Sequence, residues 1–188
     1  MNKTSDYIDY DKALNKGLTL LKDNKKFRLG FYIIFSINTG LRISDVLQIR
    51  HIDLVDERLV IKEKKTKKRR EITINNVVKK AYSKLVSRLD ELSITYNDDD
   101  YIFISQKGSV YKTQSINDIL KTLFNSKTLQ ISSHSLRKSF ARRVYSNLSE
   151  SENALVLLSD IFSHTSIAIT RRYIGIRQET ISNVYISL

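Results

Sequence analysis

Hydrophobic residues spaced three and four positions apart predict helices over most of this 188-residue chain. The predicted helices cover about residues 10–22, 27–38, 43–49, 76–92, 113–125, 134–147, 152–162 and 166–173. Gly40 follows the second helix, at a position where a left-handed residue commonly ends a helix. Ser44 is the expected cap of the short third helix. The pattern therefore predicts a mostly helical protein.

The hydrophobic period changes from helical to alternating in the middle of the chain. Segments 58–62 (RLVIK) and 70–74 (REITI) are rich in β-branched residues and predict a hairpin with a long cationic tip. Segment 101–105 (YIFIS) predicts a third strand. The expected fold class is α+β, mostly α-helical, with a small three-stranded antiparallel sheet. We expect one domain over 1–188, with an N-terminal extension and first helix in 1–25 and a tail in 177–188.

The charge of the chain changes this picture by pointing to a partner. Thirty-two Lys and Arg against 20 Asp and Glu give a net charge of +12, which predicts nucleic acid as the partner, although an acidic membrane surface would also bind. The absence of Cys excludes disulfides and thiol metal sites. The longest apolar run, 31–37, is far shorter than the roughly 20 residues of a membrane span. No signal peptide is recognisable, so we expect a cytoplasmic location.

Three short motifs carry candidate chemistry. Arg42 follows a glycine turn in NTGLRISD, and His134 and Arg137 stand one helical turn apart, so that both can face one group. His164 precedes a helix that Thr165 could cap, and Tyr173 follows nine positions later. Each motif alone is weak, since surface arginines and half-buried tyrosines are common.

The order and spacing of these motifs are specific in combination. G-L-R-x-S-D, a basic hairpin, H-x-L-R-K-S-F and H-x₈-Y-I-G together resemble the tyrosine recombinase (phage integrase) family over about residues 27–175. The resemblance implies the catalytic fold of that family. It also implies a site-specific enzyme that cleaves and rejoins DNA through a 3′-phosphotyrosyl intermediate and a Holliday junction. The outcome would be integration, excision, inversion or resolution, with no cofactor and no metal.

The resemblance also implies which residues are catalytic: Arg42, Lys65, His134, Arg137, His164 and Tyr173. Tyr173 would be the nucleophile, and Arg42 and Arg137 would clamp the phosphate, because a guanidinium fork meets two phosphate oxygens. His134 would assist the phenol proton, and His164 would hydrogen-bond a non-bridging oxygen. Lys65, in the hairpin, would protonate the leaving oxygen, with Lys64 and Lys67 as rivals for that role.

Further basic residues are candidates for contacts to the DNA backbone, which are independent of sequence and sensitive to salt. They lie in the hairpin or on the helix that carries Arg137: Lys64, Lys67, Lys68, Arg69, Lys138 and Arg142. The partners implied by the resemblance are double-stranded DNA with a specific recombination site, a homotetramer on that DNA, and an accessory DNA-bending protein. The tail 177–188 would dock either on a neighbouring protomer or on its own domain.

Two departures from the family pattern stand out. Where relatives often read Leu-Gly-His, this chain has FSH at 162–164. Only about 25 residues precede the catalytic region, so we expect no separate N-terminal core-binding domain, as in the minimal members of the family. A catalytic fragment of a longer integrase would look the same.

Other functions compete with recombination. A type IB topoisomerase shares the Arg-Lys-Arg-His-Tyr chemistry and needs only one protomer. A DNA-binding protein without activity is disfavoured because all the expected side chains are present. A basic RNA-binding or ribosomal protein explains the charge but leaves the motif spacing unexplained.

Overall fold

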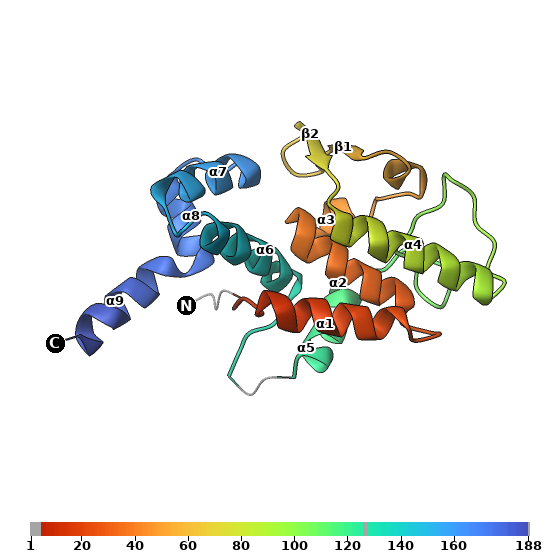
Figure 1. Ribbon diagram of the computed structural model, residues 1–188, viewed down its shortest axis with the longest axis horizontal. Coiled ribbons are helices and arrows are strands. Elements are labelled where there is room, and N and C mark those ends of the chain that lie inside the picture. The colour runs from red at the N-terminus through yellow and green to blue at the C-terminus, as the bar shows by residue number, and fades with distance from the viewer. Residues whose placement is uncertain (1–4, 126–127, 188) are drawn as a thin grey trace.

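The computed structural model describes residues 5–125 and 128–187, leaving aside the side chains of 177–181. Helices dominate it, and one short hairpin projects from the upper side of Figure 1. The elements are α1 (Tyr10–Leu21), α2 (Phe27–Thr39), α3 (Ile43–Val46), the 3₁₀ turn η1 (Ile52–Leu54), β1 (Arg58–Lys62), β2 (Arg69–Thr73), α4 (Asn76–Glu91), α5 (Thr113–Leu123), α6 (Ser133–Asn147), α7 (Glu152–Phe162), α8 (Ile167–Ile174) and α9 (Ile176–Ile186).

Helix α2 forms the centre of the larger hydrophobic core. Nearly all of its residues are buried, as expected for a helix that is apolar on every side. Helices α1, α4 and α6 pack around it. The rings of Phe31 and Phe35 lie 5.7 Å and 5.8 Å from that of Phe103, between α4 and α5 in the chain. These contacts hold α2 in the core, and the candidate site begins at its C-terminal end.

The sheet has two strands, so the predicted third strand is wrong. β1 and β2 pair antiparallel, with Arg58 opposite Thr73 and Lys62 opposite Arg69. Segment 101–105 makes only isolated bridges, one of them between Tyr101 and Arg50. Ile102 is fully buried and its carbonyl accepts from the Arg28 side chain at 3.1 Å. The segment therefore passes through the core, and its backbone groups form separate hydrogen bonds in place of a continuous strand pairing.

A second, smaller hydrophobic cluster joins α6 to α7 and α8. Its buried members are Ala141, Leu155, Leu158, Phe162 and Ile174. In Figure 1 this group lies to the left of the larger core, and α9 extends away from it. The molecule is thus one helical body with a smaller unit attached through α6.

The predicted helix positions are confirmed to within a few residues, except for the third. Helix α3 ends at Val46, and Arg42, not Ser44, stands at its N-cap without a side-chain cap bond. Ser44 instead lies inside the helix. The left-handed end at Gly40 is confirmed, with φ of 60°. Among the described residues, no helix is long and apolar enough to cross a membrane.

Candidate active site

The turn between α2 and α3 places Arg42 at the edge of the larger core. A Cβ atom on Gly40 would lie 2.4 Å from the Phe140 ring of α6, so only glycine lets these elements approach so closely. The turn exposes the Gly40 carbonyl toward α6 and leads directly into Arg42. The sequence of this turn therefore sets where the first candidate arginine lies.

Helix α6 brings the second arginine to the same place. Its first turn is fixed by a capping box between Ser132 and Ser135. Arg137 is 4% exposed and donates a hydrogen bond to the Gly40 carbonyl. Its guanidinium carbon lies 4.1 Å from the centre of the Phe162 ring. The two arginines, distant in sequence, thus lie at one junction.

Arg42 is held by two elements besides its own. Its Nη1 donates to Glu63 Oε2 at 2.9 Å, and its Nη2 donates to the Phe162 carbonyl at 3.2 Å. Glu63 is 2% exposed and lies just after β1. Because Phe162 also contacts Arg137, both arginines meet at the last residue of α7.

A single pocket gathers four of the six sequence candidates. It is lined by Leu41, Arg42, Ile43, Ser44, Lys65, Ser133, His134 and Arg137. The hairpin supplies Lys65, and α6 supplies both His134 and Arg137. Three separate segments therefore converge on one open hollow, whose arginines and lysine give it a positive charge that suits a phosphate group.

His164 and Tyr173 reach the site from the smaller unit. Ser163 ends α7 in a left-handed conformation, with φ of 53°, and the His164 amide donates to the Ser159 carbonyl at 2.9 Å. Ser166 caps α8, so the cap expected at Thr165 lies one residue later. His164 Nδ1 lies 2.9 Å from the hydroxyl of Thr170, which is fully buried in α8.

Tyr173 packs its ring against the other candidates. The Tyr173 ring centre lies 5.4 Å from that of Phe162 and 5.5 Å from that of His164, and the Lys138 ammonium lies 5.3 Å away. Its hydroxyl is buried close to Arg137 but forms no hydrogen bond of good geometry among the described residues. Burial raises the pKa of Tyr173 to about 12, although the charge and hydrogen bonding of Arg137 and the charge of Arg42 oppose the shift. The phenol is therefore protonated at neutral pH.

Burial and the surrounding cations both lower the pKa of the two histidines, which favours the neutral imidazoles. Removal from water, followed by the charges of Arg137 and Lys138, lowers the pKa of His134 below its ordinary 6.5. Removal from water and the charges of Arg137 and Arg42 do the same for the pKa of His164. Burial lowers the pKa of Arg137 to about 10, which leaves it charged at pH 7. The site thus offers neutral imidazoles among fixed cations.

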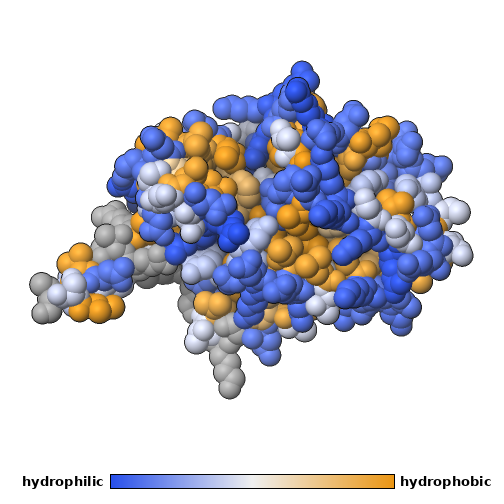
Figure 2. Space-filling model, viewed as in Figure 1, coloured by the Kyte–Doolittle hydropathy of each residue, from blue (hydrophilic) through white to orange (hydrophobic). Residues whose placement is uncertain are grey.

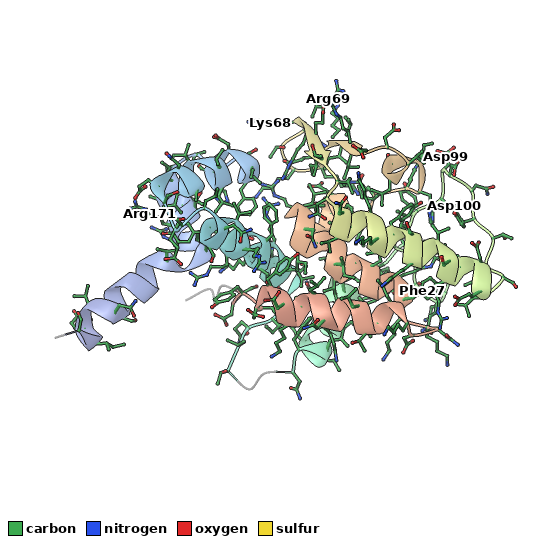
Figure 3. The ribbon with its side chains drawn as sticks, viewed as in Figure 1. Phe27, Lys68, Arg69, Asp99, Asp100 and Arg171 are labelled. Carbon is green, nitrogen blue, oxygen red and sulfur yellow. The ribbon has the colours of Figure 1, made fainter. Side chains whose placement is uncertain are left out.

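The candidate DNA contacts divide into two groups. Lys64, Lys67, Lys68 and Arg69 are exposed in the turn of the hairpin; Lys68 and Arg69 lie at its outer end in Figure 3, where Figure 2 shows a hydrophilic surface. Lys138, in contrast, is 8% exposed. The Arg142 guanidinium stacks 4.8 Å from the ring of Tyr7. Only the hairpin group points fully to solvent.

Sequence reasoning missed three residues of the site. Glu63 lies within the basic run of the hairpin, Phe162 differs from the family pattern only as part of FSH, and Thr170 lies inside a predicted helix without a motif. Within residues 5–125 and 128–187, no three His, Asp or Glu side chains lie close enough to hold a metal ion.

Comparisons with known proteins give a consistent result. The profile of the phage integrase family matches residues 11–179. The probable integrase/recombinase YoeC of Bacillus subtilis (strain 168) is 30% identical over 165 residues, which is 86% of this chain and 85% of that protein. Tyrosine recombinase XerC of Leptospira interrogans serogroup Icterohaemorrhagiae serovar copenhageni is 23% identical over 190 residues, 98% of this chain and 56% of XerC.

Solved structures share the fold. The XerA recombinase superposes with a TM-score of 0.68 at 20% identity, over all of this chain and 65% of that one. XerH recombinase, in a post-cleavage complex with a palindromic difH substrate, gives 0.68 at 21% identity, over 98% of this chain and 53% of that one. The chain thus spans about half to two thirds of the length of XerC and these structures.

Proposed function

The chain belongs to the phage integrase family of DNA strand-transferring recombinases, and from that premise we propose that it cleaves and rejoins DNA at a specific site through Tyr173. The Tyr173 oxygen bonds to phosphorus as the bond to the 5′ oxygen breaks. The products are a 3′-phosphotyrosyl link and a 5′ hydroxyl. Attack by a 5′ hydroxyl from another strand reverses the step and reseals the DNA without ATP.

The observation that carries the proposal is the convergence of the six candidates. Arg42, Lys65, His134 and Arg137 line one pocket, and Tyr173 and His164 adjoin it through the ring of Phe162. These residues come from four separate segments, and a hydrophobic core alone gives no reason to gather them.

Each group suits its proposed role. Arg42 and Arg137 stabilise charge on the non-bridging oxygens, since preorganised donors act strongly where water is excluded. Neutral His134 takes up the phenol proton, because its lowered pKa leaves it free to accept one at pH 7. His164 donates to a non-bridging oxygen. Lys65 protonates the departing oxygen.

The exposed hairpin cations support backbone contacts to duplex DNA. Four exposed cations lie close in sequence to Lys65, which lines the pocket: Lys64, Lys67, Lys68 and Arg69. We propose that they bind phosphates next to the cleaved one, which makes affinity strongly dependent on salt. We propose that the protein acts on DNA in the cytoplasm, with an accessory DNA-bending protein as a further partner.

Helix α9 supports assembly between protomers. Val184, Tyr185 and Ile186 are exposed, at 55%, 74% and 82%, so these described tail residues do not dock on their own domain. We propose that α9 packs on a neighbouring protomer in a tetramer on DNA. Deleting 178–188 and weighing the protein–DNA complexes tests this, with loss of the larger complexes as the expected result.

The central test uses a pool of nicked duplexes of randomised sequence, in which the short cleaved strand diffuses away and traps the covalent product. Adducts that survive denaturation are isolated and sequenced, and they should share one sequence element. Tyr173→Phe, which keeps the ring packing, should form none. Tyr101→Phe is the matched control, because Tyr101 is 36% exposed and is not among the residues that line the pocket.

Two outcomes would contradict the proposal. An adduct in Tyr173→Phe would exclude Tyr173 as the nucleophile. Adducts without a shared sequence, together with relaxation of supercoiled plasmid by single protomers, would indicate a type IB topoisomerase instead.

A further inference from the structure

Glu63 is a buried carboxylate surrounded by the cations of the site. Its Oε2 accepts from Arg42 Nη1 at 2.9 Å and from the Thr66 hydroxyl at 2.6 Å, and its Oε1 accepts from Arg70 Nη1 at 3.4 Å. It is 2% exposed. Such a carboxylate is costly to bury unless its oxygens are well satisfied. Here three donors satisfy them.

The carboxylate stays ionised in this setting. Burial raises the pKa of Glu63, but the Thr66 hydroxyl and the charges of Arg42 and Arg70 outweigh it and hold the pKa below its ordinary value. Glu63 therefore supplies a fixed negative charge to the site. Its position between two arginines offsets their mutual repulsion before any phosphate arrives.

The same carboxylate is part of the turn that carries Lys65. The Lys67 amide donates to the Glu63 carbonyl at 2.9 Å, and the Glu63 amide donates to the Lys68 carbonyl at 3.0 Å. Lys65 lies between Glu63 and Thr66, whose side chains are hydrogen-bonded to each other. The turn is thus closed around Lys65 by backbone bonds and by one side-chain bond.

Two bonds fasten this turn to the clamp. Glu63 holds Arg42, and the Lys64 amide donates to Asp45 Oδ1 in α3 at 2.9 Å. Asp45 is 2% exposed and therefore fixed. Because general acid catalysis requires the acid within hydrogen-bond reach of the oxygen it protonates, the turn must be held at a set distance from the arginines.

We propose that Glu63 is a positioning residue that fixes Lys65 relative to Arg42, so that the lysine ammonium faces the departing 5′ oxygen while the arginine holds the phosphate. This inference rests on the proposed function. In the step concerned, the Tyr173 oxygen bonds to phosphorus, the P–O5′ bond breaks, and the 5′ oxygen takes one proton from Lys65, which becomes a neutral amine.

The inference predicts a specific chemical signature. If Glu63 acts through Lys65, its loss impairs leaving-group protonation, and a leaving group that needs no proton abolishes the defect. If Glu63 acts only by orienting Arg42 or by supporting the fold, the defect is the same for every leaving group. Replacing the bridging 5′ oxygen by sulfur separates the two, because a thiolate departs without a proton.

The experiment compares adduct formation in single turnover on two nicked duplexes, both of the sequence recovered from the randomised pool, with oxygen or sulfur at the bridging 5′ position. With oxygen, Glu63→Gln should be slower by about 10²-fold, the size expected for misplacing a catalytic group by about an ångström. With sulfur, Glu63→Gln and Lys65→Ala should both come within a few-fold of the unchanged chain.

Two further variants make the comparison sharp. Thr66→Val removes only the hydroxyl on the turn side and leaves Arg42 paired, so its smaller defect should also vanish with sulfur. Glu71→Gln is the matched control: Glu71 lies in β2, pairs with exposed Arg58 and is 51% exposed, and it should behave as the unchanged chain. Thermal unfolding verifies that each variant is folded.

A defect in Glu63→Gln that is equal with oxygen and sulfur would overturn the inference, as would the absence of any defect with oxygen. Rescue of Glu63→Gln without rescue of Lys65→Ala would also overturn it, since another residue would then be the acid. Failure of the proposed function looks different: the unchanged chain would then form no adduct with either duplex.

Discussion

The two regions of this protein hold their shares of the site in different ways. The larger core fixes Arg42 and Arg137 at the junction of α2, α3 and α6, with buried Glu63 beside them. The smaller unit carries Tyr173 and His164 on the short helix α8 and the turn before it, next to a cluster of only a few apolar residues. The two arginines therefore lie on the more extensive scaffold, and Tyr173, the proposed nucleophile, lies on the smaller one.

The difference extends to how polar groups are satisfied. Arg42 and Arg137 each donate to backbone acceptors of the protein, whereas the buried Tyr173 hydroxyl forms no hydrogen bond of good geometry among the described residues and has Arg137 near it. A buried hydroxyl left unsatisfied costs roughly 1–3 kcal/mol. The comparison teaches that the two arginines are bonded within the protein, while the Tyr173 hydroxyl keeps most of its hydrogen-bonding capacity for another partner.

The largest effect should come from the larger region. Arg137→Ala is expected to slow adduct formation on the selected duplex by about 10²–10³-fold, because losing one preorganised oxyanion donor costs about 3–4 kcal/mol. Arg137→Lys keeps the charge without the fork and should recover only part of the rate. A loss below tenfold in Arg137→Ala, in a variant that still folds, would remove this arginine from the clamp.

The next prediction separates the stabilities of the two regions. Leu158→Ala and Ile33→Ala each remove a fully buried side chain, and each should cost about 2–5 kcal/mol. In Ile33→Ala the whole chain loses stability. In Leu158→Ala, amide hydrogen exchange should speed up in α7 and α8 while α2 stays protected. Equal acceleration in α2 and α8 would mean that the two regions unfold as one.

A smaller effect should follow from Thr170 within the lesser region. Thr170→Val removes the hydroxyl beside His164 Nδ1, and losing one neutral hydrogen bond of about 0.5–1.5 kcal/mol should slow adduct formation by roughly 3–10-fold. Thr170→Ser keeps the hydroxyl and should restore the rate. Nitrogen NMR of the imidazole should show a changed tautomer ratio for His164 in Thr170→Val. An unchanged ratio would exclude this positioning role.

The last prediction concerns acid stability and tests the larger region alone. Burial lowers the pKa of His51 to about 4 from its ordinary 6.5. As the pH falls below 6.5, the unfolded chain binds a proton at His51, whereas the folded chain binds it only near pH 4. The free energy of unfolding therefore decreases as the pH falls from 6.5 to 4. His51→Asn cannot titrate and should show a shallower fall in urea unfolding. An identical pH dependence would refute this.

Most of the fold could be predicted because helical periodicity records which face is buried. The errors have local causes. Segment 101–105 alternates like a strand, but Ile102 and Phe103 are both fully buried, and no pattern of single residues distinguishes a core crossing from a paired strand. His51 lies in a polar stretch with no buried-face pattern, yet it is 1% exposed and its ring stacks on that of Tyr96 at 4.0 Å.

The sequence predicts the motif residues of the candidate site but not the residues that hold them in place. Arg42, His134, Arg137, His164 and Tyr173 have a recognisable spacing. Glu63 did carry a signal: Leu59, Ile61 and Glu63 alternate along β1 and just beyond it, and the alternation places all three toward the core. A carboxylate that faces the core requires a positively charged or hydrogen-bonding partner there. The sequence does not name that partner, and the fold identifies it as Arg42.

The two contacts of Phe162 determine which substitutions this position can accept. Arg42 contacts its carbonyl and Arg137 contacts its ring. The first contact belongs to the backbone and is kept by any side chain that leaves α7 intact, whereas the second is a cation–π contact that requires an aromatic ring. Phe162→Leu should therefore keep the bond to Arg42 and lose the stacking under Arg137.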